Sequence, residues 1–141
     1  MVRLEWRDFL AVSPEAHCIT LEIPPNAAVE LRSILETMKR LLRQSLKPEG
    51  AHALQLARAT GAPLVQCAFA VRADADRLAA LVGAVDTPAD RWASHRLRPL
   101  DDALYSTIYE QAGPPDTRRQ RRRADAREAA ARDALRWGTT W

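Results

Sequence analysis

The sequence predicts a mainly α-helical protein of the α+β class, in which a compact helical domain carries a two-stranded N-terminal β-hairpin and a basic C-terminal helical arm. Two short N-terminal segments alternate apolar and polar residues, as half-buried strands do. Much of the rest spaces its apolar residues as helices do, and the last twenty-eight residues combine alanine with clustered arginine. A length of 141 residues suits one core, so we expect a single domain at residues 1–113 and an arm at residues 114–141.

The composition is that of a folded globular protein. Hydrophobic residues make up 47% of the chain and charged residues 28%, which is too apolar for a disordered chain. No apolar run approaches the roughly eighteen residues of a membrane-spanning helix, and Arg3, Glu5 and Arg7 stand where a signal peptide would be apolar. We therefore expect no membrane partner and no secretion by a signal peptide, with the protein in the cytoplasm or within a soluble assembly.

The N-terminal hairpin is predicted from residues 2–7 and 18–23. Apolar residues occupy every second position in both segments, and Ser13-Pro14-Glu15 between them favours a turn. Two strands alone are not stable in water, so one face of the hairpin must pack on another element.

A long amphipathic helix over residues 26–46 supplies that element. Asn26 follows two prolines and can cap the helix, and Lys47-Pro48-Glu49-Gly50 ends it. Most charged residues lie on the opposite face from the apolar positions, which are Leu31, Ile34, Leu35, Met38, Leu41, Leu42 and Leu46.

Three short helices are predicted next, over residues 51–60, 63–73 and 75–84. Gly61 favours a stop between the first two of them. A strand over residues 63–72 remains an alternative, because apolar residues also alternate there at Val65, Cys67, Phe69 and Val71.

The remainder of the body is predicted to be helical as well. Thr87-Pro88 favours a short helix that runs through Trp92, and Pro99 interrupts the chain before a helix over residues 100–111. Gly113-Pro114-Pro115 then ends the body.

Residues 54–82 resemble a helix-turn-helix unit. Ala57 corresponds to the tight contact between the helices, Gly61 to the turn, and Val71 to the packing position behind the second helix. The resemblance implies that the second helix, at about residues 63–72, enters the major groove of DNA. The polar side chains available there to read bases are Gln66 and Arg72.

The same stretch is similar to the three-helix N-terminal module of elongation factor Ts. The residues that carry this likeness are Thr60-Gly61-Ala62 followed by Cys67 and Ala70. The likeness implies a small helical docking unit and does not imply nucleotide exchange, because the rest of that factor has no counterpart in this chain.

The sequence holds no catalytic or metal-binding signature. His17, His52 and His95 lack the spacing of paired metal ligands, and Cys18 and Cys67 fit buried thiols better than a metal site. The serines lack the Gly-x-Ser-x-Gly pattern, and the five glycines form no phosphate loop. We therefore expect no enzyme activity, no cofactor, no metal and no small-molecule substrate.

The arm concentrates the positive charge of the chain. From Asp116 to Arg136 there are eight arginines and four acidic residues, a net +4, whereas the whole chain carries +3. A guanidinium group can donate two parallel hydrogen bonds to the oxygens of one phosphate, and aromatic rings stack on bases or fill protein pockets. The residues expected to contact nucleic acid or a partner are Arg118, Arg119, Arg121, Arg122, Arg123, Arg127, Arg132, Trp137 and Trp141. A possible second basic face consists of Lys39, Arg40, Arg43 and Lys47.

These features favour a non-enzymatic accessory subunit that binds a nucleic-acid phosphate backbone without strong sequence preference inside a larger complex. One alternative is a structural or assembly protein of a virion or tail-like machine, whose arm docks on neighbouring protein. A helix-turn-helix regulator is the second alternative. The expected partners are therefore nucleic acid, protein subunits of an assembly, or both.

Overall fold

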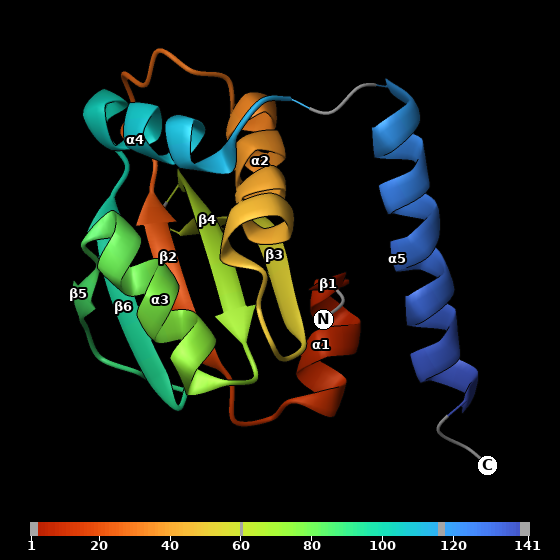
Figure 1. Cartoon of the computed structure of the whole chain (residues 1–141). Coiled ribbons are helices and arrows are strands. Elements are labelled where there is room, and N and C mark those ends of the chain that lie inside the picture. The colour runs from red at the N-terminus through yellow and green to blue at the C-terminus, as the bar shows by residue number, and fades with distance from the viewer. Residues whose placement is uncertain (1–2, 60, 116–117, 139–141) are drawn as a thin grey trace.

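The structure is a computed structural model that describes residues 3–59, 61–115 and 118–138; within the last helix, it describes side chains from residue 122 to residue 133. Six strands form one mixed sheet in the order β1-β3-β4-β2-β6-β5 (Figure 1). The strands are β1 (Arg3–Leu4), β2 (His17–Glu22), β3 (His52–Ala59), β4 (Ala62–Phe69), β5 (Val85–Asp86) and β6 (Ser94–Pro99). The helices are α1 (Trp6–Val12), α2 (Leu31–Arg40), the π-helical turn η1 (Leu41–Leu46), α3 (Arg72–Val82), α4 (Asp102–Ala112) and α5 (Arg118–Gly138).

The prediction of a mainly helical domain is wrong, because the centre of the molecule is this sheet. The helices predicted over residues 51–60 and 63–73 are replaced by β3 and β4, which form an antiparallel hairpin in which Leu54 lies opposite Cys67, and the next helix, α3, begins at Arg72. Gly61 turns the chain between them with φ at +83°, a conformation that favours glycine. The strand alternative for residues 63–72 is therefore the one that the structure adopts, over Ala62–Phe69.

The predicted N-terminal hairpin is also wrong. Residues 6–12 form α1, and β1 pairs in parallel with β3, with Arg3 opposite His52. The segment 18–23 is a strand, but its neighbours in the sheet are β4 and β6. Strand β1 ends at Leu4 although the alternation continues to Trp6, because residues 6–12 form a helix that buries Phe9 completely. No helix forms over residues 87–92.

The helices expected at residues 26–46, 75–84 and 100–111 are present with shifted ends. The first begins at Leu31 and widens into the π-helical η1 after Arg40. Asp101 caps α4 by accepting a hydrogen bond from the backbone N–H of Leu104 at 2.7 Å. These helices supply the cover that the sheet needs on one face.

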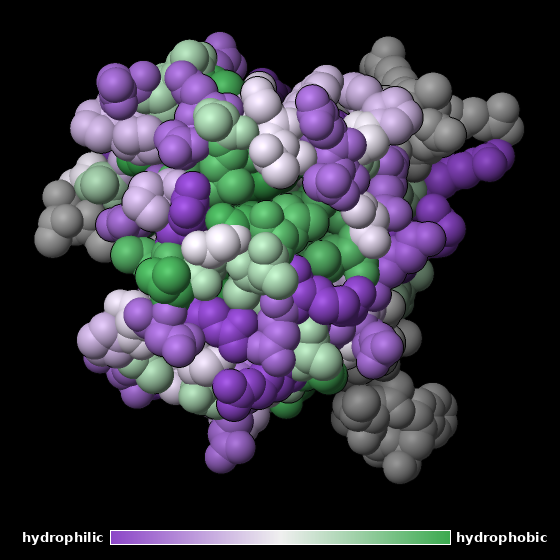
Figure 2. Space-filling view, turned by 60° about the vertical axis from the view of Figure 1, so that its left-hand side comes forward, coloured by the Kyte–Doolittle hydropathy of each residue, from purple (hydrophilic) through white to green (hydrophobic). Residues whose placement is uncertain are grey.

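The core has two parts, one on each face of the sheet. The larger cluster packs α2, η1, α3 and α4 against residues such as Ile19, Val65 and Phe69. The smaller cluster, on the other face, packs α1 through Phe9 against Leu4 and its neighbours. Figure 2 turns the β5–β6 edge toward the viewer and shows hydrophobic side chains across the middle of that side, between hydrophilic borders. The basic arm lies elsewhere, because β1 and α5 are at the opposite edge of the sheet (Figure 1).

Candidate functional site

A cleft of about 450 Å³ lies between α5 and the body of the protein. Its walls come from β1, η1 with the loop after it, the first residue of β3, and the side of α5 that faces the body. Small apolar groups of Leu42, Pro48, Ala124 and Ala131 form part of the lining. The polar lining consists of Arg3, Arg43, Lys47, His52, Arg127 and Glu128.

An ion pair holds α5 against the first strand. Arg3 Nη2 donates to Glu128 Oε2 at 2.7 Å, and both side chains are less than one-fifth exposed. Arg132 Nη1 lies 3.9 Å from the same oxygen, and Ala124, one turn before Glu128, is 4% exposed. The carboxylate therefore faces the body and sets how α5 is oriented over the cleft.

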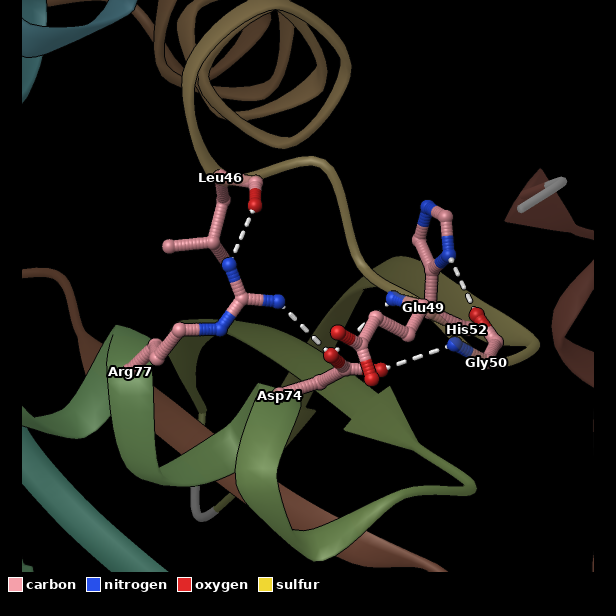
Figure 3. A network of polar contacts seen from close by, with 6 residues as sticks. All are labelled: Leu46, Glu49, Gly50, His52, Asp74 and Arg77. Atoms are coloured by element: carbon pink, nitrogen blue, oxygen red, sulfur yellow. Dashed lines mark hydrogen bonds and ion pairs between the residues drawn. The ribbon is translucent and has the colours of Figure 1, made fainter.

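The loop that carries Lys47 is fixed from below by Asp74 of α3 (Figure 3). The backbone N–H groups of Glu49 and Gly50 donate to the two oxygens of the Asp74 carboxylate at 3.0 and 2.9 Å. Arg77 donates to Asp74 Oδ1 and, with its other terminal nitrogen, to the carbonyl oxygen of Leu46, both at 2.7 Å. One buried carboxylate thus ties the end of η1 and the following loop to α3.

The environment of Asp74 favours its charged form. Burial alone would raise the pKa of this carboxyl, but the two backbone hydrogen bonds and the Arg77 guanidinium outweigh burial and lower the pKa below its ordinary value. The loop is therefore held by a charged acceptor at neutral pH, and charge-assisted hydrogen bonds are the stronger kind.

Lys47 stands at the point where this loop leaves η1. Its backbone is left-handed, with φ at 49°, and its N–H donates to the carbonyl oxygen of Leu42 at 2.9 Å. The side chain is exposed and lines the cleft. A flexible cation is thus presented from a backbone that the Asp74 network holds in place.

His52 closes the floor of the cleft and is 4% exposed. Its ring stacks on Phe69 with the centroids 6.3 Å apart, and Nδ1 lies 3.4 Å from the carbonyl oxygen of Gly50. Burial lowers the pKa of His52, and the charge of Arg3 acts in the same direction, while the bond to Gly50 and the charge of Glu128 oppose them. The neutral ring is therefore favoured near pH 7.

The charges of the cleft do not cancel. Four cationic side chains and one carboxylate line it, a net charge of +3 when His52 is neutral. Among the described residues, neither Lys47 nor Arg127 has an ion-pair partner. Such a site attracts anions, and phosphate oxygens suit guanidinium and ammonium donors.

The structure distributes the predicted arm residues over several environments. Arg127 lines the cleft and Arg132 lies beside Glu128, whereas Arg122 and Arg123 are exposed on α5 away from the cleft lining. Four of the predicted residues belong to α5 by their backbone but have side chains outside the described part, namely Arg118, Arg119, Arg121 and Trp137. Trp141 lies outside the described residues altogether.

The predicted second basic face is divided. Arg43 and Lys47 line the cleft, but Arg40 is only 7% exposed and donates from Nε to the carbonyl oxygen of Gly113 at 3.1 Å. Its guanidinium lies 5.2 Å from the ring centre of Tyr109, so Arg40 secures the end of α4. Lys39 is half-buried and is not part of the cleft lining.

Three important residues of this site were not predicted from the sequence: Arg3, His52 and Asp74. Arg3 has the pattern of an ordinary polar residue in an alternating segment, and its partner Glu128 is far away in the sequence. The only local signal for Asp74 was its place in the first turn of α3, which also suits an exposed acidic residue.

A second hollow, of about 520 Å³, lies on the sheet face opposite the larger core cluster. A ladder of side-chain hydrogen bonds crosses four strands on this face, and its members Thr20, Gln66 and His95 line the hollow. Gln55 Nε2 donates to Gln66 Oε1 at 2.8 Å, Gln66 Nε2 donates to Thr20 Oγ1 at 3.3 Å, and that oxygen lies 2.7 Å from His95 Nε2. Gln66, expected to read bases from a helix, is instead a member of this ladder on β4.

Comparisons with family models, with curated proteins and with solved structures found no match for this chain. Within residues 3–59, 61–115 and 118–138, no group of three or more His, Cys, Asp or Glu side chains is arranged to hold a metal ion. No helix in the described part of the chain is long and apolar enough to span a membrane.

Proposed function

We propose that this protein is a non-enzymatic accessory subunit that binds the phosphate groups of nucleic acid without strong sequence preference. The observation that carries the proposal is the position of Lys47 and Arg127 on one cleft. One belongs to the second basic segment and the other to the arm, and the two lie far apart in the sequence.

The chemistry of the lining supports this function. Arginine and lysine provide hydrogen-bond donors and positive charge for phosphate oxygens, and each neutralised phosphate releases counterions. Contacts of this kind fix a strand in place but do not read its bases.

Fluorescence anisotropy with random single- and double-stranded oligonucleotides at low salt tests the proposal. We expect Lys47→Gln and Arg127→Gln each to weaken binding by about 10- to 150-fold, the range for a lost hydrogen bond to a charged group. Each should also reduce the slope of log affinity against log salt by about 1.

Two matched variants control for the change in net charge. Lys39→Gln removes the other lysine of the chain, and Arg123→Gln removes an exposed arginine of the same helix. Both should change the affinity by less than about 3-fold, as expected for charges outside the contact. Absence of binding at low salt contradicts the proposed function, and equal losses in the cleft and control variants contradict the proposed site.

A second candidate is a structural or assembly protein whose arm docks on a neighbouring subunit. The observation that favours it is the slight burial of α5: of its side chains in the range 122–133, only Ala124 is buried. Deleting residues 114–141 separates the two functions. A change in oligomeric state by light scattering, with no oligonucleotide binding by the intact protein, would support the assembly function.

A further inference from the structure

We infer, resting on the proposed function, that the cleft receives the terminal phosphate of a nucleic-acid strand, a phosphomonoester, in preference to internal phosphodiesters. Cationic side chains from separate elements of the fold converge on this cleft. Arg3 on β1, Lys47 directly after η1 and Arg127 on α5 come from three different elements, and all of them line one open cleft. A site for an internal backbone instead needs cations spaced along a track that successive phosphates follow.

The net charge of the cleft lining also favours a phosphomonoester. The lining carries a net charge of +3, as described above. An internal phosphodiester brings one negative charge, whereas a phosphomonoester carries about −1.5 to −2 at pH 7. Because the attraction scales with the product of the charges, the same cleft holds the monoester more tightly.

Glu128 reduces the positive potential of the cleft but does not reverse it. It occupies one of the donors of Arg3 and repels any anion that approaches. Because this repulsion also scales with the charge of the ligand, the preference for the monoester depends on the four cations of the lining outweighing the one carboxylate.

The size of the cleft suits one terminal group. A volume of about 450 Å³ lies within the range of small-ligand sites and holds one nucleotide-sized group. Leu42 and Pro48 on the body and Ala124 on α5 give the apolar surface that a sugar or base can cover. The η1–β3 loop, held by Asp74, fixes one wall, so the volume does not depend on a loop that must first become ordered.

Oligonucleotides of one sequence that differ only at their ends test the inference on the full-length protein. A strand with a 5′-phosphate, a strand with a 3′-phosphate, a strand with two hydroxyl ends and a covalently closed circle are compared by anisotropy at a fixed ionic strength. We expect at least one phosphorylated strand to bind about tenfold more tightly than the hydroxyl strand, the gain from an additional charged hydrogen bond. The circle should bind like the hydroxyl strand.

The cleft variants connect this preference to the proposed residues. Lys47→Gln and Arg127→Gln should remove the preference for the phosphorylated end, while Lys39→Gln and Arg123→Gln should keep it. Inorganic phosphate should displace the phosphorylated strand more effectively than chloride does at equal ionic strength. Equal affinity for all four ligands overturns the inference while leaving the proposed function intact, whereas failure to bind any of them overturns both.

Discussion

The guanidinium of Arg3 lies 2.7 Å from the carboxylate of Glu128, so the first described strand and the last helix are joined by an ion pair between residues 125 positions apart in the sequence. Both side chains are largely shielded from water, at 19% and 17% exposure. Apart from burial of Ala124, this pair is the clearest contact between α5 and the body in the described part of the chain.

Glu128→Gln is expected to loosen α5. Loss of the charge weakens the bond to Arg3, and a double-mutant cycle with Arg3→Gln should give a coupling energy of about 1 kcal/mol for a pair of this exposure. Hydrogen exchange measured by mass spectrometry should show faster exchange of α5 amides and unchanged exchange in β2 and β4. Asp125→Asn, an exposed site on the same helix, is the control. Unchanged protection of α5 in Glu128→Gln would mean that the ion pair does not hold the helix.

Asp74→Asn is expected to destabilise the whole protein. The variant keeps the shape of the side chain but leaves Arg77 and two backbone N–H groups with a weaker acceptor, so we expect the free energy of unfolding to fall by about 2–4 kcal/mol. Urea denaturation, monitored by circular dichroism, measures this free energy. Asp76→Asn on the same helix, where the carboxylate is half exposed, should cost much less. A loss in Asp74→Asn no larger than in Asp76→Asn would contradict a role for Asp74 in holding the loop.

The pH dependence of stability should reflect the same carboxyl. The folded-state pKa of Asp74 lies below its ordinary value of 3.8, so its contribution is fully present above about pH 4 and is lost as the pH falls through the folded pKa. The free energy of unfolding of the native sequence should therefore decline from pH 4 downward. In Asp74→Asn the decline should be shallower over the same range, and parallel curves would disprove the assignment.

Gly50→Ala is expected to disturb the wall of the cleft. A Cβ atom at this position would lie 2.5 Å from Val71 Cγ2, which is too close for two carbon atoms. We expect a destabilisation of about 1–3 kcal/mol, typical of overpacking, measured by urea denaturation. Val71→Ala removes the clashing methyl group, so the double variant should recover part of the loss. If adding Val71→Ala only increases the damage, close packing is not the reason for glycine at this position.

Cys18 and Cys67 should be inert in the folded protein. Burial raises the pKa of Cys18 to about 12, and burial also raises the pKa of Cys67. At pH 8 a thiol reagent such as Ellman's reagent should react with neither cysteine in the native protein and with both in urea. The two residues cannot pair with each other, because Cys67 lies opposite Ile19 and the side chains of Cys18 and Ile19 leave opposite faces of the sheet. Rapid reaction of the native protein would contradict this burial.

The helices that sequence reasoning found are those with a long, regular apolar spacing. Residues 31–46 repeat apolar positions over several turns, a signal that tertiary contacts rarely reverse. By contrast, β3 consists largely of Ala, Leu, Gln and Arg, which favour helices by intrinsic propensity. Its pairing with β1 and β4 outweighs that preference. The local sequence of β3 does not indicate this pairing, because the partner strands lie elsewhere in the chain.

The sequence predicts some residues of the candidate site but not their proximity in the fold. Clustering of charge identified Arg127 within the arm and Lys47 within a second basic segment, but nothing in the sequence placed them together. The pattern of charge also groups Arg40 with these residues, because a charged residue in the sequence carries no sign of its burial. Arg3 was missed because a single arginine in an alternating segment is ordinary, and only the fold gives it a partner on α5.

The position of α5 in chain order has a consequence for biosynthesis. Every strand of the sheet and the helices that cover it precede residue 118, so this part of the protein leaves the ribosome before α5 does. Because Arg127 and Glu128 are made after all of them, the wall that they form is added to a body whose sheet can already have folded. A nascent chain therefore completes the strands of its sheet before it completes the charged cleft.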